Sequence, residues 1–242
     1  MRPYSRVYAT VNLDAVASNM KSMRENLPAS TLIMGSVKAD GYGHGSVPIA
    51  KTIEPYVFGY AVATIDEGII LRRHGINKTI LILGVTHESQ YEELLRYDIR
   101  TSMFQYEKAK KLSDLAVKQG KKAVVHLALD TGMSRIGMKA DREHAKEAAA
   151  IAALEGIEVE GLFTHFARAD ETDKSAYEEQ YRRYKEFLGY LEELGVQIPI
   201  RHCSNSAGIV ESLESNHMDM VRAGIAIYGM YPSDEVDHNS VK

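Results

Sequence analysis

The sequence predicts an α/β protein, a (β/α)8 barrel of the TIM type preceded by one extra strand at the N-terminus. Short β-branched segments alternate with longer segments of helical period, which is the pattern of parallel βαβ units. The segments TLIMGSV, TILIL and KAVVHLALD are apolar on both faces, as expected for strands covered by helices outside and packed inside. Eight consecutive units in about 200 residues match the size of a closed barrel. An open doubly wound sheet remains an alternative, because periodicity does not report closure.

Nine segments have the composition of strands, one more than the barrel requires. They are residues 7–12, 31–37, 56–62, 79–83, 99–102, 122–130, 157–165, 200–204 and 220–228. The first, Val7 to Asn12, is separated from the others by a long helical segment. Residues 1–14 are therefore assigned to an extra strand outside the barrel.

Eight segments have helical period and connect these strands. They are residues 15–26, 46–54, 65–74, 88–97, 105–119, 142–154, 174–194 and 207–212. Gly75, Gly120, Gly156 and Gly195 each fall just past a helix, where glycine forms a left-handed C-cap at least cost. We expect residues 1–232 to form the barrel domain and the polar residues 233–242 to be a linker-like tail.

Composition excludes several classes of function. With 242 residues, 45% of them apolar, the chain can bury one substantial core. The net charge of −4 offers no basic field for nucleic acid, and the apolar run from Ala148 to Leu154 is shorter than the roughly 20 residues of a membrane span. Cys203 is the single cysteine, and the N-terminus has no apolar signal segment. We expect a cytoplasmic protein without a nucleic-acid or membrane partner.

Polar residues and glycines gather where the predicted strands end, which is where barrel enzymes build their active sites. They are Lys38, Tyr42, Arg135, His165, Asn205, Ser206, Arg222 and Gly224, and the apolar Ile225 directly follows Gly224. Each alone has a structural explanation: lysines are mostly exposed, arginines form surface ion pairs, and a serine can cap a helix. Their convergence on one mouth favours function.

Lys38 precedes three alternate glycines, Gly41, Gly43 and Gly45, which let the backbone approach a ligand closely. A lysine at a barrel mouth can lose its proton by desolvation and act as a Schiff-base nucleophile. The segment is not a G-x-G-x-x-G dinucleotide motif, because Ser46 stands where the third glycine is needed. No H-E-x-x-H or G-x-S-x-G motif occurs, so we predict neither a metal site nor hydrolase chemistry.

The run SVKADGYGHG, residues 36–45, closely resembles the pyridoxal 5′-phosphate (PLP) attachment motif of bacterial alanine racemases. The segments DTGMSRIG, FTHFARAD, HCSNSAG and VRAGIAIYG are similar to the family's other signatures and follow in the same order. This resemblance spans nearly the whole chain. It implies a PLP-dependent isomerase of fold type III that interconverts L-alanine and D-alanine and supplies D-alanine for peptidoglycan.

The resemblance also implies roles for the residues at the mouth. Lys38 would form the internal aldimine and act as the base on one face of the substrate, with Arg135 and His165 as further catalytic residues. The phosphate would be held by Tyr42, Ser206 and the backbone of Gly224 and Ile225, near Asn205. By the same resemblance His165 lies against the cofactor ring, and Arg135 sits near its phenolic oxygen.

Arg222 would face the pyridine nitrogen and be oriented by His202, again by resemblance. A guanidinium gives up its proton reluctantly, so Arg222 would leave that nitrogen unprotonated and weaken the cofactor as an electron sink. Ala128 departs from the family pattern, because many members carry a carbamylated lysine there that positions the arginine corresponding to Arg135.

Racemisation needs acid/base groups on both faces of the substrate. In the family the second is a tyrosine from a C-terminal β-domain of the partner subunit, and this sequence ends where that domain would begin. We expect a homodimer for the full-length parent, and for the chain alone cofactor binding with little or no racemisation. The strand at residues 7–12 would pair with the absent domain.

The same barrel architecture allows three other functions. One is a non-catalytic PLP carrier built on the same barrel, and transfer of cofactor to an apoenzyme would favour it. Another is a racemase of serine or a different amino acid, which the sequence does not separate from an alanine enzyme. A basic-amino-acid decarboxylase is disfavoured, because its G-G-G phosphate loop is absent.

Overall fold

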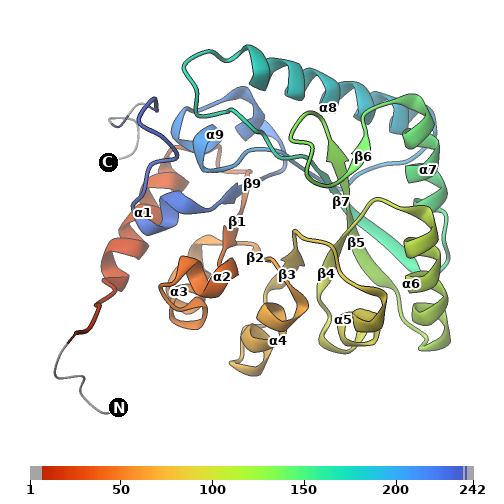
Figure 1. Ribbon diagram of the computed structural model, residues 1–242, viewed down its shortest axis with the longest axis horizontal. Helices are drawn as coiled ribbons and strands as arrows, with labels where there is room; N and C mark the ends of the chain where they lie inside the picture. Colours follow the sequence, from red (N-terminus) through yellow and green to blue (C-terminus); the bar gives the residue numbers. More distant parts are fainter. Residues whose placement is uncertain (1–6, 237, 239–242) are drawn as a thin grey trace.

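The computed structural model describes residues 7–236 and residue 238, and its centre is a closed ring of eight parallel strands (Figure 1). The strands are β1 (Leu32–Ser36), β2 (Gly59–Val62), β3 (Thr79–Ile82), β4 (Arg100–Met103), β5 (Ala123–Asp130), β7 (Ile157–Phe163), β8 (Ile200–His202) and β9 (Met220–Ala223), with the two-residue β6 (Met138–Lys139) beside β5. The order is β4-β3-β2-β1-β9-β8-β7-β5, and pairing of β4 with β5 closes the ring. The predicted barrel is confirmed, and the open sheet is excluded.

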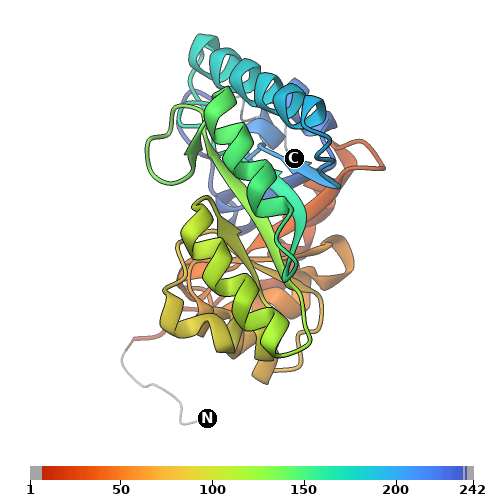
Figure 2. The ribbon, with the colours of Figure 1, turned by 90° about the vertical axis from the view of Figure 1, so that its right-hand side faces the viewer.

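Helices surround the ring on its outer side. They are α1 (Leu13–Glu25), α3 (Ser46–Ile53), α4 (Ile65–Arg73), α5 (Tyr91–Tyr97), α6 (Tyr106–Lys118), α7 (Arg142–Ala152) and α8 (Ser175–Glu193), with the short α2 (Lys38–Tyr42) and α9 (Ser206–Val210) following β1 and β8. Figure 2 shows α6, α7 and α8 in succession along one side. Asn12, Thr64 and Asp141 cap α1, α4 and α7 through their side-chain oxygens. No helix in the described residues is long and apolar enough to cross a bilayer.

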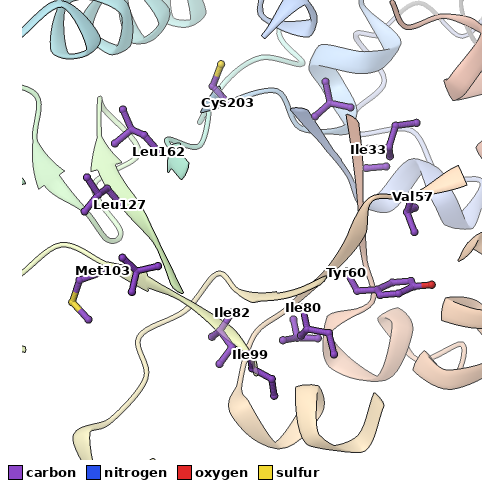
Figure 3. Packing of buried hydrophobic residues seen from close by; sticks show 14 of the residues in the cluster. Ile33, Val57, Tyr60, Ile80, Ile82, Ile99, Met103, Leu127, Leu162 and Cys203 are labelled. Atoms are coloured by element: carbon purple, nitrogen blue, oxygen red, sulfur yellow. The ribbon is translucent and has the colours of Figure 1, made fainter. Parts of the chain in front are cut away.

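Alternate residues of each strand face the helices and the barrel interior. Ile33, Tyr60 and Ile80 point from the strands toward the helices (Figure 3) and belong to the large core cluster. The neighbouring positions turn inward, and a small separate cluster fills one half of the interior; its members are Met34, Ala61, Leu81 and Met220. The other half, on β5, β8 and β9, contains the buried polar side chains of His126, His202 and Arg222. The interior is therefore packed, with one apolar and one polar half.

The extra strand lies elsewhere than the sequence predicts. Residues 7–12 form no strand and lead away from the barrel (Figure 1), and the side chains of Val7 and Tyr8 are 83% and 76% exposed. A β-branched composition does not make a strand without a partner edge, and no described strand lies beside this segment. The ninth strand is instead β6, which pairs with β5 through Leu129 and Met138.

One further expectation near the mouth is wrong in detail. Strand β9 ends at Ala223, and a 3-10 helix, Ile225–Tyr228, replaces the second half of the predicted strand. The Ser206 hydroxyl accepts hydrogen bonds from the backbone N–H groups of Gly224 and Ala226, which a strand would have offered to a neighbour. Of the predicted linker-like tail at residues 233–242, residues 237 and 239–242 lie outside the described part of the chain; within it, Glu235 accepts a hydrogen bond from the Thr172 N–H and Val236 is buried.

Gly156 is needed for close packing rather than for a left-handed cap. Gly75, Gly120 and Gly195 have the predicted positive φ, but Gly156 does not. An added Cβ at Gly156 would lie 2.2 Å from the Ser113 carbonyl oxygen on α6.

We expect Gly156→Ala to lower the free energy of unfolding by about 2 kcal/mol or more, because backbone must move to admit the methyl group. Urea unfolding would measure this. Gly189→Ala is the matched control: it lies in α8 with nothing within 4 Å of the added Cβ, so it should be neutral or stabilising by up to about 1 kcal/mol. Equal stabilities of the two variants would contradict this packing argument.

Candidate active site

A cavity of about 310 Å³ opens at the carboxyl ends of the strands, within the range of roughly 300 to 1,000 Å³ seen for small-molecule sites. It is lined by eight of the residues singled out from the sequence, namely Lys38, Tyr42, His165, Asn205, Ser206, Arg222, Gly224 and Ile225. His202 lies behind this wall in contact with Arg222, and Arg135 does not line the cavity. A second cavity of about 360 Å³ near α5 and α6 is lined by Arg96, Asp98, Lys121 and Lys122 among apolar side chains, and contains none of the residues singled out from the sequence.

Lys38 begins a strained turn at the end of β1. The next residues, Ala39, Asp40, Gly41 and Tyr42, all have φ between 50° and 62°, so the chain makes a left-handed turn. Each non-glycine residue in this conformation costs about 1 kcal/mol or more. Local bonds hold the turn, since Asp40 Oδ1 accepts from the Ser46 N–H at 2.8 Å and Glu67 Oε1 accepts from the Ala39 N–H at 2.8 Å. The strain sits where Lys38 and Tyr42 enter the cavity, as is common at functional sites.

Three hydroxyl-bearing side chains surround Gly224. A Cβ at this position would lie 3.3 Å from the Tyr42 hydroxyl, 3.6 Å from Ser206 Oγ and 3.9 Å from the Ser36 Cβ. The Ser36 hydroxyl is buried and has no hydrogen-bond partner within the described part of the chain. Asn205, rather than Ser206, caps α9 by accepting from the Gly208 N–H, which leaves the Ser206 hydroxyl free to face Gly224. This cradle offers hydroxyl donors to an anion.

Arg222 is buried at the base of the cavity, with 4% of its surface exposed. Its Nη1 donates to His202 Nδ1 at 2.8 Å, and its Nη2 donates to the carbonyl oxygens of Thr164 at 2.7 Å and Cys203 at 3.1 Å. Burial lowers the pKa of Arg222 to about 10, which still leaves the guanidinium charged at neutral pH. The side chain is thus a fixed cation at the cavity base.

His165 stands beside this cation with a neutral ring. Burial, together with the positive charges of Arg222, Arg135 and Lys38, lowers the pKa of His165 to about 3. Arg222 Nη2 lies 3.4 Å from His165 Nδ1, and a guanidinium can only donate, so Nδ1 accepts and the ring proton is on Nε2. His165 can therefore pack against a planar ligand without adding charge.

The structure does not bring Arg135 into the cluster. Its side chain is exposed in the loop after β5, and it forms no hydrogen bond or ion pair with any residue that the structure describes. Ala128 is fully buried on β5 opposite Phe163 and has no group that could reach Arg135. The positive charge of Arg135 still helps to lower the pKa of His165 through space.

Sequence reasoning missed two groups at the mouth. Ser36 ends the apolar strand two residues before Lys38, a position that could have identified it. Tyr228 was hidden in a segment predicted to be strand; its hydroxyl donates to the Ser36 carbonyl at 2.9 Å, and its ring lies 4.9 Å from that of Tyr42. Across residues 7–236, no three His, Cys, Asp or Glu side chains are arranged to hold a metal ion.

Comparison with known proteins identifies relatives along almost the whole chain. Residues 11–232 match the family described as "Alanine racemase, N-terminal domain". The alanine racemases of Desulforamulus reducens and Clostridium perfringens are each 44% identical, over 96% and 98% of this chain. Among solved structures, an alanine racemase of Clostridium difficile 630 in complex with cycloserine superposes with a TM-score of 0.94 at 41% identity, and covers 96% of this chain.

The match is to part of each relative. The chain spans 62% of the D. reducens protein, 61% of the C. perfringens protein and 64% of the C. difficile chain. The alanine racemase of Bacillus anthracis with bound L-Ala-P superposes with a TM-score of 0.87 at 35% identity. The family match and the shared barrel together show that this chain belongs to the alanine racemase family and corresponds to its N-terminal domain.

Proposed function

We propose that this chain is the cofactor-binding barrel of a PLP-dependent racemase that interconverts L-alanine and D-alanine, with Lys38 as the residue that attaches the cofactor. The observation that carries the proposal is one cavity lined by a lysine, a hydroxyl cradle and a buried guanidinium. The relatives named alanine racemase support the choice of substrate. In the cell such an enzyme supplies D-alanine for peptidoglycan.

The residues of the cavity fit PLP at its charged and polar ends. A phosphate accepts hydrogen bonds only, and the cradle of Ser36, Tyr42 and Ser206 supplies donors around Gly224. At the other end Arg222 can only donate, so it suits an unprotonated pyridine nitrogen. Asn205 and Ile225 complete the lining between these ends.

PLP supplies an electron-withdrawing ring that makes the α-proton of a bound amino acid removable. The protein's own groups then control where that proton goes. Lys38 enters from one side of the cavity and can accept or return a proton on that face. The His165 ring is neutral, and the Arg222 guanidinium keeps its proton at neutral pH. Both side chains would therefore hold the ligand without giving it a proton. Racemisation also needs an acid/base group on the opposite face of the substrate, and the proposed source is a further domain of the partner subunit in the full-length homodimer.

Hydrogen exchange tests the proposal in the chain itself. With PLP present in D2O, NMR would follow loss of the α-proton signal from L-alanine and, separately, from D-alanine. We expect exchange of one enantiomer to be much faster, with little D-alanine formed from L-alanine. Bound cofactor without exchange of either enantiomer would instead favour the carrier function, and equal exchange of both would contradict a single-face base.

Ser206→Ala is expected to weaken PLP binding about tenfold or more, because a hydrogen bond to a charged group contributes about 1.5 to 3 kcal/mol. Equilibrium titration of absorbance or fluorescence would measure the dissociation constant. Ser212→Ala is the control, since Ser212 is an exposed serine just past α9. Unchanged affinity of Ser206→Ala relative to this control would exclude Ser206 from the phosphate site.

A further inference from the structure

A continuous line of hydrogen-bonded side chains leads from the active-site cavity into the barrel interior. Arg222 Nη1 lies 2.8 Å from His202 Nδ1, and His202 Nε2 lies 2.8 Å from His126 Nδ1. His126 Nε2 in turn lies 2.9 Å from Glu160 Oε2. We call these four residues the Glu160 chain. They come from β9, β8, β5 and β7, so the line crosses the polar half of the barrel.

The two ends of the Glu160 chain require the same direction for every hydrogen bond, because the Arg222 guanidinium can only donate and the Glu160 carboxylate can only accept. A guanidinium has no acceptor, so His202 Nδ1 must be unprotonated and its ring proton must be on Nε2. That proton is donated to His126 Nδ1, which places the His126 proton on Nε2, facing the Glu160 carboxylate. Both rings are therefore neutral, and only one pair of tautomers satisfies all three bonds. Burial lowers the pKa of both histidines, which agrees with neutral rings.

Arg222 is a buried cation, and its direct contacts supply no negative charge. The other acceptors around its guanidinium are neutral: the carbonyl oxygens of Thr164, His202 and Cys203 and the His165 ring nitrogen. No carboxylate of the described residues contacts Arg222. A buried cation without a counter-charge is costly, and the carboxylate connected to it by hydrogen bonds is Glu160. Arg100 is the cation that contacts this carboxylate directly, with its Nε 3.5 Å from Glu160 Oε2.

The backbone of β7 is built to place Glu160 against His126. Val125 pairs with Val159 and His126 pairs with Gly161, so Glu160 is the extra residue of a β-bulge. A bulge redirects a side chain that a regular strand would aim elsewhere. Gly161 leaves room for the ring, since a Cβ there would lie 2.5 Å from His126 Nδ1.

We propose that Glu160 is a positioning residue, which fixes the tautomers of His126 and His202 and through them holds the Arg222 guanidinium in place for the cofactor. Glu160 touches neither cofactor nor substrate. Its carboxylate accepts at the far end of the chain, so each ring presents its lone pair toward Arg222. The part of this inference that concerns the cofactor rests on the proposed PLP function, whereas the tautomers are a property of the chain without cofactor.

The test compares Glu160→Met and Glu160→Gln with the control Glu158→Gln. Methionine cannot accept the His126 proton, so the present tautomers would leave the buried His126 Nε2–H unpaired, whereas the reversed tautomers would break the bond from Arg222 Nη1 to His202. The glutamine amide can either accept from His126 or donate to it. Neither variant therefore favours one direction as the carboxylate does. Glu158 is an exposed carboxylate on the same strand, two residues away. Side-chain ¹⁵N NMR of the cofactor-free protein reports which ring nitrogen of His126 and His202 carries the proton. If Glu160→Met does not fold, Glu160→Gln, which keeps the size of the side chain, carries the test.

We expect Nε2-protonated rings in the native protein and in Glu158→Gln, and loss of this single form at His126 and His202 in the Glu160 variants. The visible absorption maximum of bound PLP should shift in the same variants, because Arg222 is less firmly held. Nδ1-protonated rings in the native protein, or unchanged tautomers in Glu160→Met, would overturn the proposal. If the tautomers change as expected but no variant binds PLP, the positioning role of Glu160 stands and the proposed function fails.

Discussion

Lys38→Ala is expected to abolish covalent capture of PLP by the chain. Lys38 is the one lysine among the described residues that line the cavity, and covalent attachment of the aldehyde requires a primary amine. Removing it leaves the hydroxyl cradle and Arg222, which hold PLP only by non-covalent contacts. Mass spectrometry after borohydride reduction should find no pyridoxyl group in this variant.

The control for this experiment is Lys51→Ala. Lys51 is exposed on α3, outside the cavity, and its loss should leave the amount of adduct unchanged. Residual non-covalent binding in Lys38→Ala, seen as PLP that dialysis removes, would agree with the cradle. An adduct of undiminished amount in Lys38→Ala would contradict the assignment of this lysine.

The free energy of unfolding is expected to fall steeply as the pH drops below about 6.5. Burial lowers the pKa of His126, His165 and His202 from the ordinary value of 6.5, in the case of His165 to about 3. Below pH 6.5 the unfolded chain binds protons at these three positions and the folded chain does not. Acid therefore favours unfolding, and the stability contributed by the neutral rings is fully present only above the unfolded pKa.

Each of these histidines can contribute at most about 1.4 kcal/mol per pH unit, so the three together set an upper limit of about 4 kcal/mol per unit. Urea unfolding at about pH 7.5 and about pH 5.5 would measure the change. This window lies above the range in which most carboxylates titrate, so the histidines dominate it. A stability that is the same at both values would show that the three rings are accessible to protons in the folded chain.

The barrel could be predicted because its signal is repeated along the chain. Eight apolar strands alternate with helices, and each repeat supports the same architecture. The site residues could be located for a related reason: a strand end in a parallel barrel fixes which edge a residue occupies, so Lys38, His165 and Arg222 had to meet. The structure places these three on one cavity.

Other features depend on contacts that a local pattern does not contain. The segment from Gly224 to Tyr228 has the composition of a strand. In the structure its Gly224 and Ala226 N–H groups donate to the Ser206 hydroxyl, and residues 225–228 form a 3-10 helix. Residues 7–12 have a similar composition and lack a partner strand. The inward turn of Glu160 depends on a bulge defined only by its pairing with β5. In each case the local conformation depends on whether a distant part of the chain supplies a contact.

Arg135 marks the limit of transferring a role by resemblance. The sequence motif around it matches the family, but the position that would anchor it is Ala128, whose methyl group can form no hydrogen bond. The exposed side chain in the structure agrees with that missing anchor. In the structure Arg135 acts on the site through its positive charge, which helps to lower the pKa of His165, and not through a fixed contact.

The central claim is that the mouth of this barrel binds PLP through Lys38. The most direct test incubates the unmodified chain with PLP, reduces it with borohydride and maps the pyridoxyl group by peptide mass spectrometry. The structure predicts one adduct per chain, on the peptide that contains Lys38. No adduct, or labels scattered over exposed lysines such as Lys51, would contradict the claim.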